Sequence, residues 1–180
     1  AGQEYKPRKF EVEGDASSAT YFQAIAHFTG KSLEITNLPK TTKQPDANFK
    51  KLLTGKPIKA DLNNMPDTVP LVAVVAALTK GKSRLTNIAN LRIKECDRIA
   101  VMQKELKKIG IETRSDKDWL EIEGNPENIK PATIDPHNDH RIAMAFAVIK
   151  ALHPKIRIKN PSCVKKSYPN FWEDFKKITK

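Results

Sequence analysis

The sequence has few cysteines and no long hydrophobic run. Its two cysteines, Cys96 and Cys163, show neither metal-site spacing nor the number needed for a disulfide framework, and we expect two free thiols in a reducing cytosol. The longest apolar run, residues 69–78, contains a proline and falls short of the roughly 20 residues that span a bilayer. No apolar segment of the signal-peptide kind follows the amino terminus. These absences predict a cytoplasmic protein outside the membrane.

The excess of basic residues is the compositional feature that says most about possible binding partners. The 32 Lys and Arg residues exceed the 21 Asp and Glu residues and give a formal net charge of +11. This balance suits nucleic acid, a membrane surface or small anionic substrates. No basic run is interleaved with aromatic residues, no nucleic-acid motif is present, and most lysines have the spacing of a solvated helix surface. Charge alone therefore leaves the partner open.

The hydrophobic pattern predicts alternating strands and helices, an α/β (α+β) fold. The 180 residues suffice for a substantial core in one domain or at most two small ones. Helix starts are expected where Asp or Ser side chains can accept hydrogen bonds from the first backbone amides. The expected strands are residues 9–13, 32–36, 58–62, 83–88, 111–114, 119–123 and 155–159, and the expected helices are a helix from the turn at 14–18 to Gly30 and helices at 45–53, 69–78, 95–109, 141–152 and 169–178.

These elements fall into three similar units. Residues 30–37, 81–87 and, more weakly, 154–160 repeat one pattern, a basic turn followed by a short strand that ends near Asn. Such repetition indicates a pseudo-threefold domain. One helix in each unit is apolar on nearly every side, so we expect three buried helices. Their starts, near Asp15, Asp67 and Asp139, should meet at one end of the domain, where backbone amides and helix dipoles favour an anion.

Four basic residues lie in loops or at helix starts, where the helix dipole disfavours a cation. Residues placed against a local preference indicate function, and arginine suits two-point capture of a carboxylate or phosphate. The four are Lys94, Arg98, Arg141 and Lys166.

The acidic residues and the histidine of these stretches allow two interpretations. Asp67 and Glu95 are either helix-start acids or proton-transfer groups. His140 is either a proton carrier or a hydrogen-bonding residue at a helix start. For Asp97 we favour a structural role, as a cap or as the partner of an arginine.

At these residues the chain resembles the 5-enolpyruvylshikimate-3-phosphate synthase family. Five stretches match in the order of the family, from near residue 9 to the carboxyl terminus, and together they are far more specific than any one of them. Cys96 departs mildly, because the family usually has Ser or Thr there. The stretches are GDASSA at 14–19, MPD at 65–67, NLRIKECDR at 90–98, NDHRIAM at 138–144 and SYPNFW at 167–172.

The resemblance implies transfer of the enolpyruvyl group of phosphoenolpyruvate to the 5-hydroxyl of shikimate 3-phosphate, with release of phosphate. The reaction proceeds through a tetrahedral intermediate and needs neither metal nor organic cofactor. By motif, Asp67 is the base at the shikimate hydroxyl and Glu95 a proton-transfer group. Asn90 and Lys94 contact shikimate 3-phosphate. The residues implied to hold phosphoenolpyruvate, or to lie next to it, are Arg98, His140, Arg141 and Lys166.

The resemblance also bears on domain organisation. Family members have two similar domains, each built from three βαβαββ-type units, which close over the substrates. The chain looks like the carboxyl-terminal domain alone, residues 9–180, after a start at 1–8 that is disordered or foreign to the protein. We expect a monomeric half-site with little turnover, whose partner is the absent amino-terminal domain. The alternatives are a domain like UDP-N-acetylglucosamine enolpyruvyl transferase, or a non-catalytic basic domain that binds polyanions.

Overall fold

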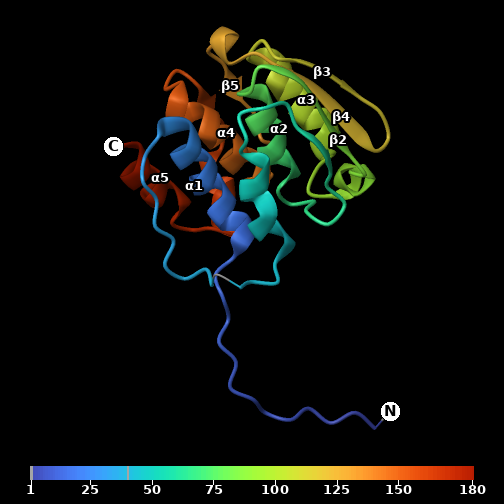
Figure 1. Ribbon diagram of the computed structural model, residues 1–180, viewed down its shortest axis with the longest axis vertical. Coiled ribbons are helices and arrows are strands. Elements are labelled where there is room, and N and C mark those ends of the chain that lie inside the picture. The colour runs from blue at the N-terminus through green and yellow to red at the C-terminus, as the bar shows by residue number, and fades with distance from the viewer. Residues whose placement is uncertain (1, 40) are drawn as a thin grey trace.

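Three apolar helices form the centre of the fold (Figure 1). The computed structural model describes residues 2–39 and 41–180, and none of the helices in these ranges is long and apolar enough to cross a membrane. The three helices contact one another, and in the second of them every side chain is buried. The prediction of three buried helices is confirmed. They are α1 (Ala16–Thr29), α2 (Val69–Ala77) and α4 (His140–Leu152).

A four-stranded sheet lies beside these helices in the order β1-β2-β4-β3 (Figure 1). β1 is parallel to β2, and β4 is antiparallel to both β2 and β3. With α2 and α3, the strands form one complete βαβαββ unit, so the predicted α/β class and the predicted hairpin are confirmed. The elements are β1 (Lys59–Asp61), β2 (Gly81–Thr86), α3 (Arg98–Lys108), β3 (Glu112–Ser115) and β4 (Trp119–Gly124).

The other two units are shorter. In the third unit β5 pairs in parallel with β6, and short helices follow. In the first unit a 3-10 helix, η1, comes after α1, and only residues 53–58 separate η1 from β1, so the unit has no hairpin. The predicted repeat is therefore complete in the second unit alone. The remaining elements are η1 (Pro45–Leu52), η2 (Ala89–Ile93), η3 (Pro126–Asn128), β5 (Thr133–Ile134), β6 (Arg157–Ile158), η4 (Pro161–Lys166) and α5 (Phe171–Thr179).

The strands predicted at 9–13 and 32–36 do not form. Residues 2–13 are an exposed arm that extends away from the body of the protein (Figure 1), with Phe10 and Val12 85% and 82% exposed. Alternation of apolar and polar side chains is insufficient without a backbone ladder. Just beyond the two segments, Gly14 N donates to Asn37 O at 2.9 Å, but no ladder of such bonds joins the segments themselves within the described residues. Of the predicted disordered start at 1–8, residue 1 lies outside the described residues.

Candidate functional site

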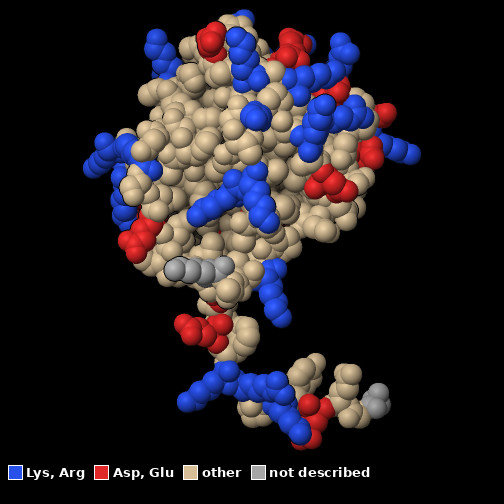
Figure 2. Space-filling view, viewed as in Figure 1, with Lys and Arg blue, Asp and Glu red and all other residues tan. Residues whose placement is uncertain are grey.

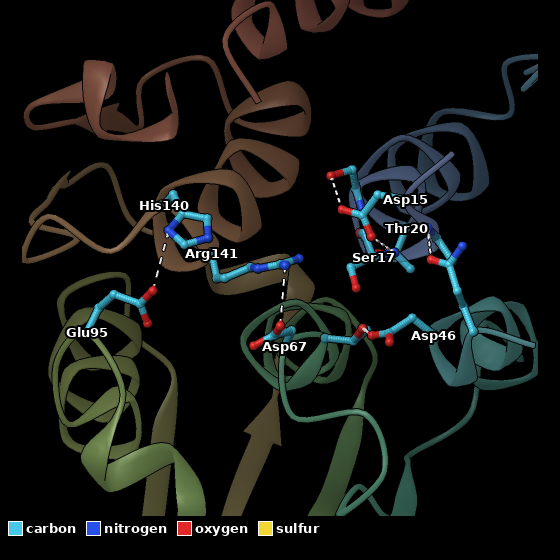
Figure 3. A network of polar contacts seen from close by, with 12 residues as sticks. Asp15, Ser17, Thr20, Asp46, Asp67, Glu95, His140 and Arg141 are labelled. Atoms are coloured by element: carbon cyan, nitrogen blue, oxygen red, sulfur yellow. Dashed lines mark hydrogen bonds and ion pairs between the residues drawn. The ribbon is translucent and has the colours of Figure 1, made fainter. Parts of the chain in front are cut away.

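The helix starts of the three units meet around Asp67 and Arg141 (Figure 3). Asp67 lies just before α2, Arg141 lies in the first turn of α4, and Arg141 Nη2 donates to Asp67 Oδ2 at 3.3 Å. Asp15, at the start of α1, lies beside them in Figure 3. The predicted convergence of the three helix starts at one end of the domain is confirmed.

Arg98 is an almost fully enclosed cation in this region, and its side chain is 1% exposed. It donates to three carboxylates: Asp139 at 2.7 Å, Glu95 at 2.8 Å and Asp67 at 3.1 Å. Burial lowers the pKa of Arg98, but the hydrogen bond to Asp139 and the charge of that carboxylate outweigh it and raise the pKa. Arg98 therefore joins residues from three parts of the chain through one buried guanidinium.

Glu95 lies before α3, whereas the sequence predicted a helix from residue 95 onward. The helix begins at Arg98 because Asp97 caps it, accepting from Ala100 N at 3.0 Å. Glu95 is thereby free to accept from Lys166 Nζ at 2.9 Å. Burial raises the pKa of Glu95, but the hydrogen bond from Lys166 and the charge of Arg98 lower it to about 2. Glu95 is thus a carboxylate at neutral pH in this arrangement.

His140 and Arg141 face the same region from α4. His140 Nδ1 lies 3.9 Å from Glu95 Oε1, and burial together with the charge of Arg141 lowers the pKa of His140. Among the described residues, the buried Nε and Nη1 of Arg141 and Nδ1 of His140 have no hydrogen-bond partner. Buried donors without partners are costly. The open N–H groups of Arg141 suit an anionic ligand.

Backbone amides contribute less to an anion site than the sequence suggested. Asp15 accepts from Ser17 N at 3.0 Å, and Asp139 accepts from Arg141 N at 2.8 Å. The first amides of α1 and α4 are thus bonded to the chain's own carboxylates. The expectation that helix-start amides favour an anion is therefore wrong for these capped amides, whereas no side chain caps the start of α2. The basic side chains remain as the groups that can bind one.

Two further predicted residues lie at the edge of the cluster. Lys94 is exposed. Burial raises the pKa of Asp67, but the charges of Arg141 and Arg98 and, to a smaller extent, that of Lys94 lower it below the ordinary value. Asn90 is in η2, and its Oδ1 is buried without a partner in the part of the chain that the structure describes. No hydrogen bond or ion pair of those residues joins Asn90 to the arginines.

Sequence reasoning missed two residues of the cluster. Asp139 was assigned only to a helix start, yet its fully buried carboxylate also binds Arg98. Its place in the NDHR stretch was the available signal. The other is Tyr21, a buried residue of α1. Burial raises the pKa of Tyr21 to about 12, against the opposing charge of Arg141. Nothing in the helical spacing of Tyr21 distinguished it from its apolar neighbours.

The arrangement has a defined chemistry. Several cations and two partly exposed carboxylates share one region, which suits the binding of a small anion and the transfer of a proton to or from it. Elsewhere on the face shown in Figure 2, Lys and Arg are scattered among Asp and Glu and form no continuous basic surface. The fold and the cluster define an α/β domain with a group of cationic side chains suited to a small anionic ligand.

Sequence comparison places the domain in a known family. The family described as EPSP synthase (3-phosphoshikimate 1-carboxyvinyltransferase) matches residues 1–54 and 48–175, most of the chain. The chain belongs to the EPSP synthase family. The two matched segments meet at the end of η1, where the first unit lacks its hairpin.

Individual relatives agree with this assignment. The chain is 38% identical over 198 positions to the 3-phosphoshikimate 1-carboxyvinyltransferase of Syntrophobacter fumaroxidans, covering 99% of the chain and 47% of that protein. It is 34% identical to the enzyme of that name from Aliivibrio salmonicida, covering 99% of the chain and 46% of that protein. The chain thus spans about half the length of the curated relatives it matches.

A solved structure supports the fold. EPSP synthase from Acinetobacter baumannii superposes with a TM-score of 0.76 at 24% identity, over 93% of this chain and 46% of that one. At this identity the likeness concerns the fold alone. The helix-and-sheet arrangement is therefore that of roughly half an EPSP synthase.

Proposed function

We propose that the chain is the carboxyl-terminal domain, residues 9–180, of an EPSP synthase. The complete enzyme would transfer the enolpyruvyl group of phosphoenolpyruvate to the 5-hydroxyl of shikimate 3-phosphate and release phosphate. Membership of the family and coverage of about half of each relative support this proposal. The cytoplasmic location and the monomeric state stay predictions from the sequence.

The buried Nε and Nη1 atoms of the partly exposed Arg141, which have no partner among the described residues, are the single observation that best supports a phosphoenolpyruvate site. Arg141 can bind a carboxylate or phosphate at two points. Arg98 and Lys166 border the same region, held by Asp67 and Glu95. An anionic substrate would compete with these carboxylates for the cations. In this proposal Arg98, Arg141 and Lys166 hold phosphoenolpyruvate beside His140, and Asn90 and Lys94 contact shikimate 3-phosphate.

Asp67 and Glu95 would carry the protons. Enolpyruvyl transfer requires that the 5-hydroxyl lose a proton and that the methylene carbon of phosphoenolpyruvate gain one. The resulting methyl group must then give up a proton as phosphate leaves. Asp67, ionised beside two arginines and 38% exposed, is our candidate base. Glu95 must be protonated to act as a donor. Replacement of Glu95 by substrate as the partner of Lys166 would raise the low pKa of Glu95 toward its ordinary value, which would increase the protonated fraction of Glu95 and favour that role.

The chain alone should be nearly inactive. It offers one side of a site, and enzymes whose domains close over substrate assemble the catalytic arrangement only on closure. In any test, the amino-terminal domain that completes the site would have to be added as a separate polypeptide. We therefore expect a partner-dependent activity.

Phosphate release from phosphoenolpyruvate and shikimate 3-phosphate tests the proposal. It should be measured for this chain alone and after addition of the amino-terminal half of a related enzyme. We expect turnover only in the mixture, with loss of at least about a hundredfold in Asp67→Asn. Lys104→Ala, on the outer side of α3, is the matched control and should retain activity. Turnover by the chain alone would refute the half-site.

Binding can be tested without the second half. Titration of the chain with phosphoenolpyruvate, followed by NMR, should perturb the Arg141 side-chain signals, and Arg141→Met should weaken binding by about tenfold or more. Lys104→Ala again serves as the control. Equal binding by the Arg141 variant and the unchanged chain would argue against the proposed phosphoenolpyruvate site.

A further inference from the structure

Asp67 differs from the other aspartates at the helix starts. Asp15, Asp97 and Asp139 each accept a hydrogen bond from a backbone amide of the helix that follows. Within residues 2–39 and 41–180, no backbone amide donates to the side chain of Asp67. The carboxylate of Asp67 is consequently not fixed by its own helix. Arg98 and Arg141 hold it, and a contact that holds the backbone at the start of α2 would keep it within their reach.

The neighbouring residue supplies that contact. Thr68 is the N-cap residue of α2, but its side chain makes no capping bond. Instead the Thr68 hydroxyl, on a residue 1% exposed, donates to Asp46 Oδ1 of η1. Figure 3 shows Asp46 reaching toward α2 beside Asp67. The contact therefore links the residue next to Asp67 to a different unit of the fold.

The segment that carries Asp46 is itself anchored to α1. Gln44 precedes η1, accepts from Ala16 N at 2.7 Å and donates to Gly14 O at 2.8 Å. Phe49, in the middle of η1, is fully buried. Because α1 holds Gln44 and the core holds Phe49, the η1 segment can keep Asp46 in a fixed position between the start of α1 and the start of α2.

We propose that Asp46 is a positioning residue for Asp67 and acts through Thr68. Asp67 receives bonds of 3.1 Å from Arg98 and 3.3 Å from Arg141, near the upper limit of an N–H···O hydrogen bond. A displacement of the α2 start by a fraction of an ångström would weaken both. The Asp46–Thr68 bond keeps Asp67 between the two arginines. Its bearing on catalysis rests on the proposed function, whereas the positioning itself does not.

Substitution of Thr68 provides the test. Thr68→Val removes the hydroxyl and keeps the shape of the side chain, and Thr68→Ser restores the donor. The pKa of Asp67, which burial raises and the two arginines lower below the ordinary value, can be followed by NMR titration of its carboxyl carbon. In Thr68→Val we expect this pKa to rise by about one unit, and in Thr68→Ser to return. Asn48→Ala, elsewhere on η1, is the matched control.

A second variant removes the acceptor of the Asp46–Thr68 hydrogen bond instead of the donor. Asp46→Ala removes the acceptor while Thr68 stays in place, and it should shift the Asp67 titration in the same direction. A Thr68→Val protein that melts at a lower temperature while its Asp67 titration is unchanged would overturn the proposal, because the contact would then be merely structural. The same holds if Asp46→Ala leaves the titration unchanged in a folded protein.

Activity gives a readout that separates the two proposals. In the mixture of the two halves, Thr68→Val should lower kcat by about tenfold or more with KM nearly unchanged, and Thr68→Ser should recover most of it. Absence of turnover in the unchanged mixture would refute the proposed function alone. The Asp67 titration would still confirm or reject the positioning role.

Discussion

Arg98 illustrates how one residue determines the electrostatics of the site. Its guanidinium offers five donors in a rigid fork, and Asp139, Glu95 and Asp67 all accept from it. Asp139 is fully buried, so removal of the arginine leaves a carboxylate without water and without its cation. Loss of one partner of a buried pair is far more costly than loss of an exposed one.

We expect Arg98→Met to lower the free energy of unfolding by about 3–5 kcal/mol. Lys166→Met is the matched control, because Lys166 pairs with the same Glu95 but is 62% exposed, and its loss should be about 1 kcal/mol or less. Urea unfolding of the purified variants measures both. Similar losses in the two variants would contradict a special role for the buried guanidinium.

Glu95 makes stability depend on pH. Its pKa is about 2 in the fold, against 4.5 for an unperturbed glutamate, so between these values the unfolded chain binds more protons than the folded one. The contribution of Glu95 is therefore complete above about pH 4.5 and is lost as the pH falls through about 2. The stability difference between the unchanged chain and Glu95→Gln should disappear across this window in urea unfolding curves. The exposed Glu127→Gln should show no such convergence.

At the scale of elements, close packing of backbone against backbone limits what a position can hold. Gly124 ends β4 beside the end of α2, and a Cβ there would lie 1.8 Å from Thr79 O and 2.2 Å from Ala76 O. Both obstacles are backbone atoms that cannot rotate away. The hairpin of the second unit therefore packs on α2 only because this residue lacks a side chain.

Gly124→Ala should destabilise the fold by about 3 kcal/mol or more, since overpacking forces the backbone to shift. Gly30→Ala separates this effect from backbone strain. Gly30 ends α1 at φ 69° with nothing within 4 Å of a built Cβ, so its cost should be about 1 kcal/mol. Thermal unfolding of both variants gives the comparison. A larger loss in Gly30→Ala would show that strain, not space, dominates.

Local sequence patterns predicted the elements whose causes are local. The apolar helix at 69–78, the hairpin at 111–123 and Gly30 as a helix end are all observed. Asp97 was predicted as a cap or as the partner of an arginine, and in the structure it caps α3 and also pairs with Arg92. The strands at 9–13 and 32–36 failed because pairing is a long-range property. The Asp46–Thr68 contact could not be foreseen either, since no spacing relates the two residues. The motifs predicted that the basic residues converge on one site, but they did not predict which carboxylates pair with them.

At the scale of the whole molecule, the first unit is the least complete part of the fold. Residues 32–36 have alternating half-buried Leu33 and Ile35, yet they have no neighbouring strand within the described ranges. Cavities of about 640 and 850 Å³ border this segment, and Leu33 and Ile35 line both of them. Few contacts and unpaired backbone groups define a region of low local stability.

Hydrogen exchange should therefore separate the two related segments. Amides of residues 32–36 should exchange at least about a hundredfold faster than those of β2, which occupies the same place in the second unit and is paired on both sides. Mass spectrometry of peptides from both segments measures this. Equal protection would mean that the arm at 9–13 pairs with residues 32–36 in solution.

The short connection at residues 53–58 is a site where a hairpin could be inserted by protein engineering. It joins η1 to β1 on the surface, at the place where the second unit carries β3 and β4, and surface connections of this kind tolerate insertions. A hairpin inserted there could pair with residues 32–36, which have no neighbouring strand in the part of the chain that the structure describes. Residues 32–36 could thus pair with an inserted segment, such as a reporter peptide or a designed strand pair, in the least constrained unit of the domain.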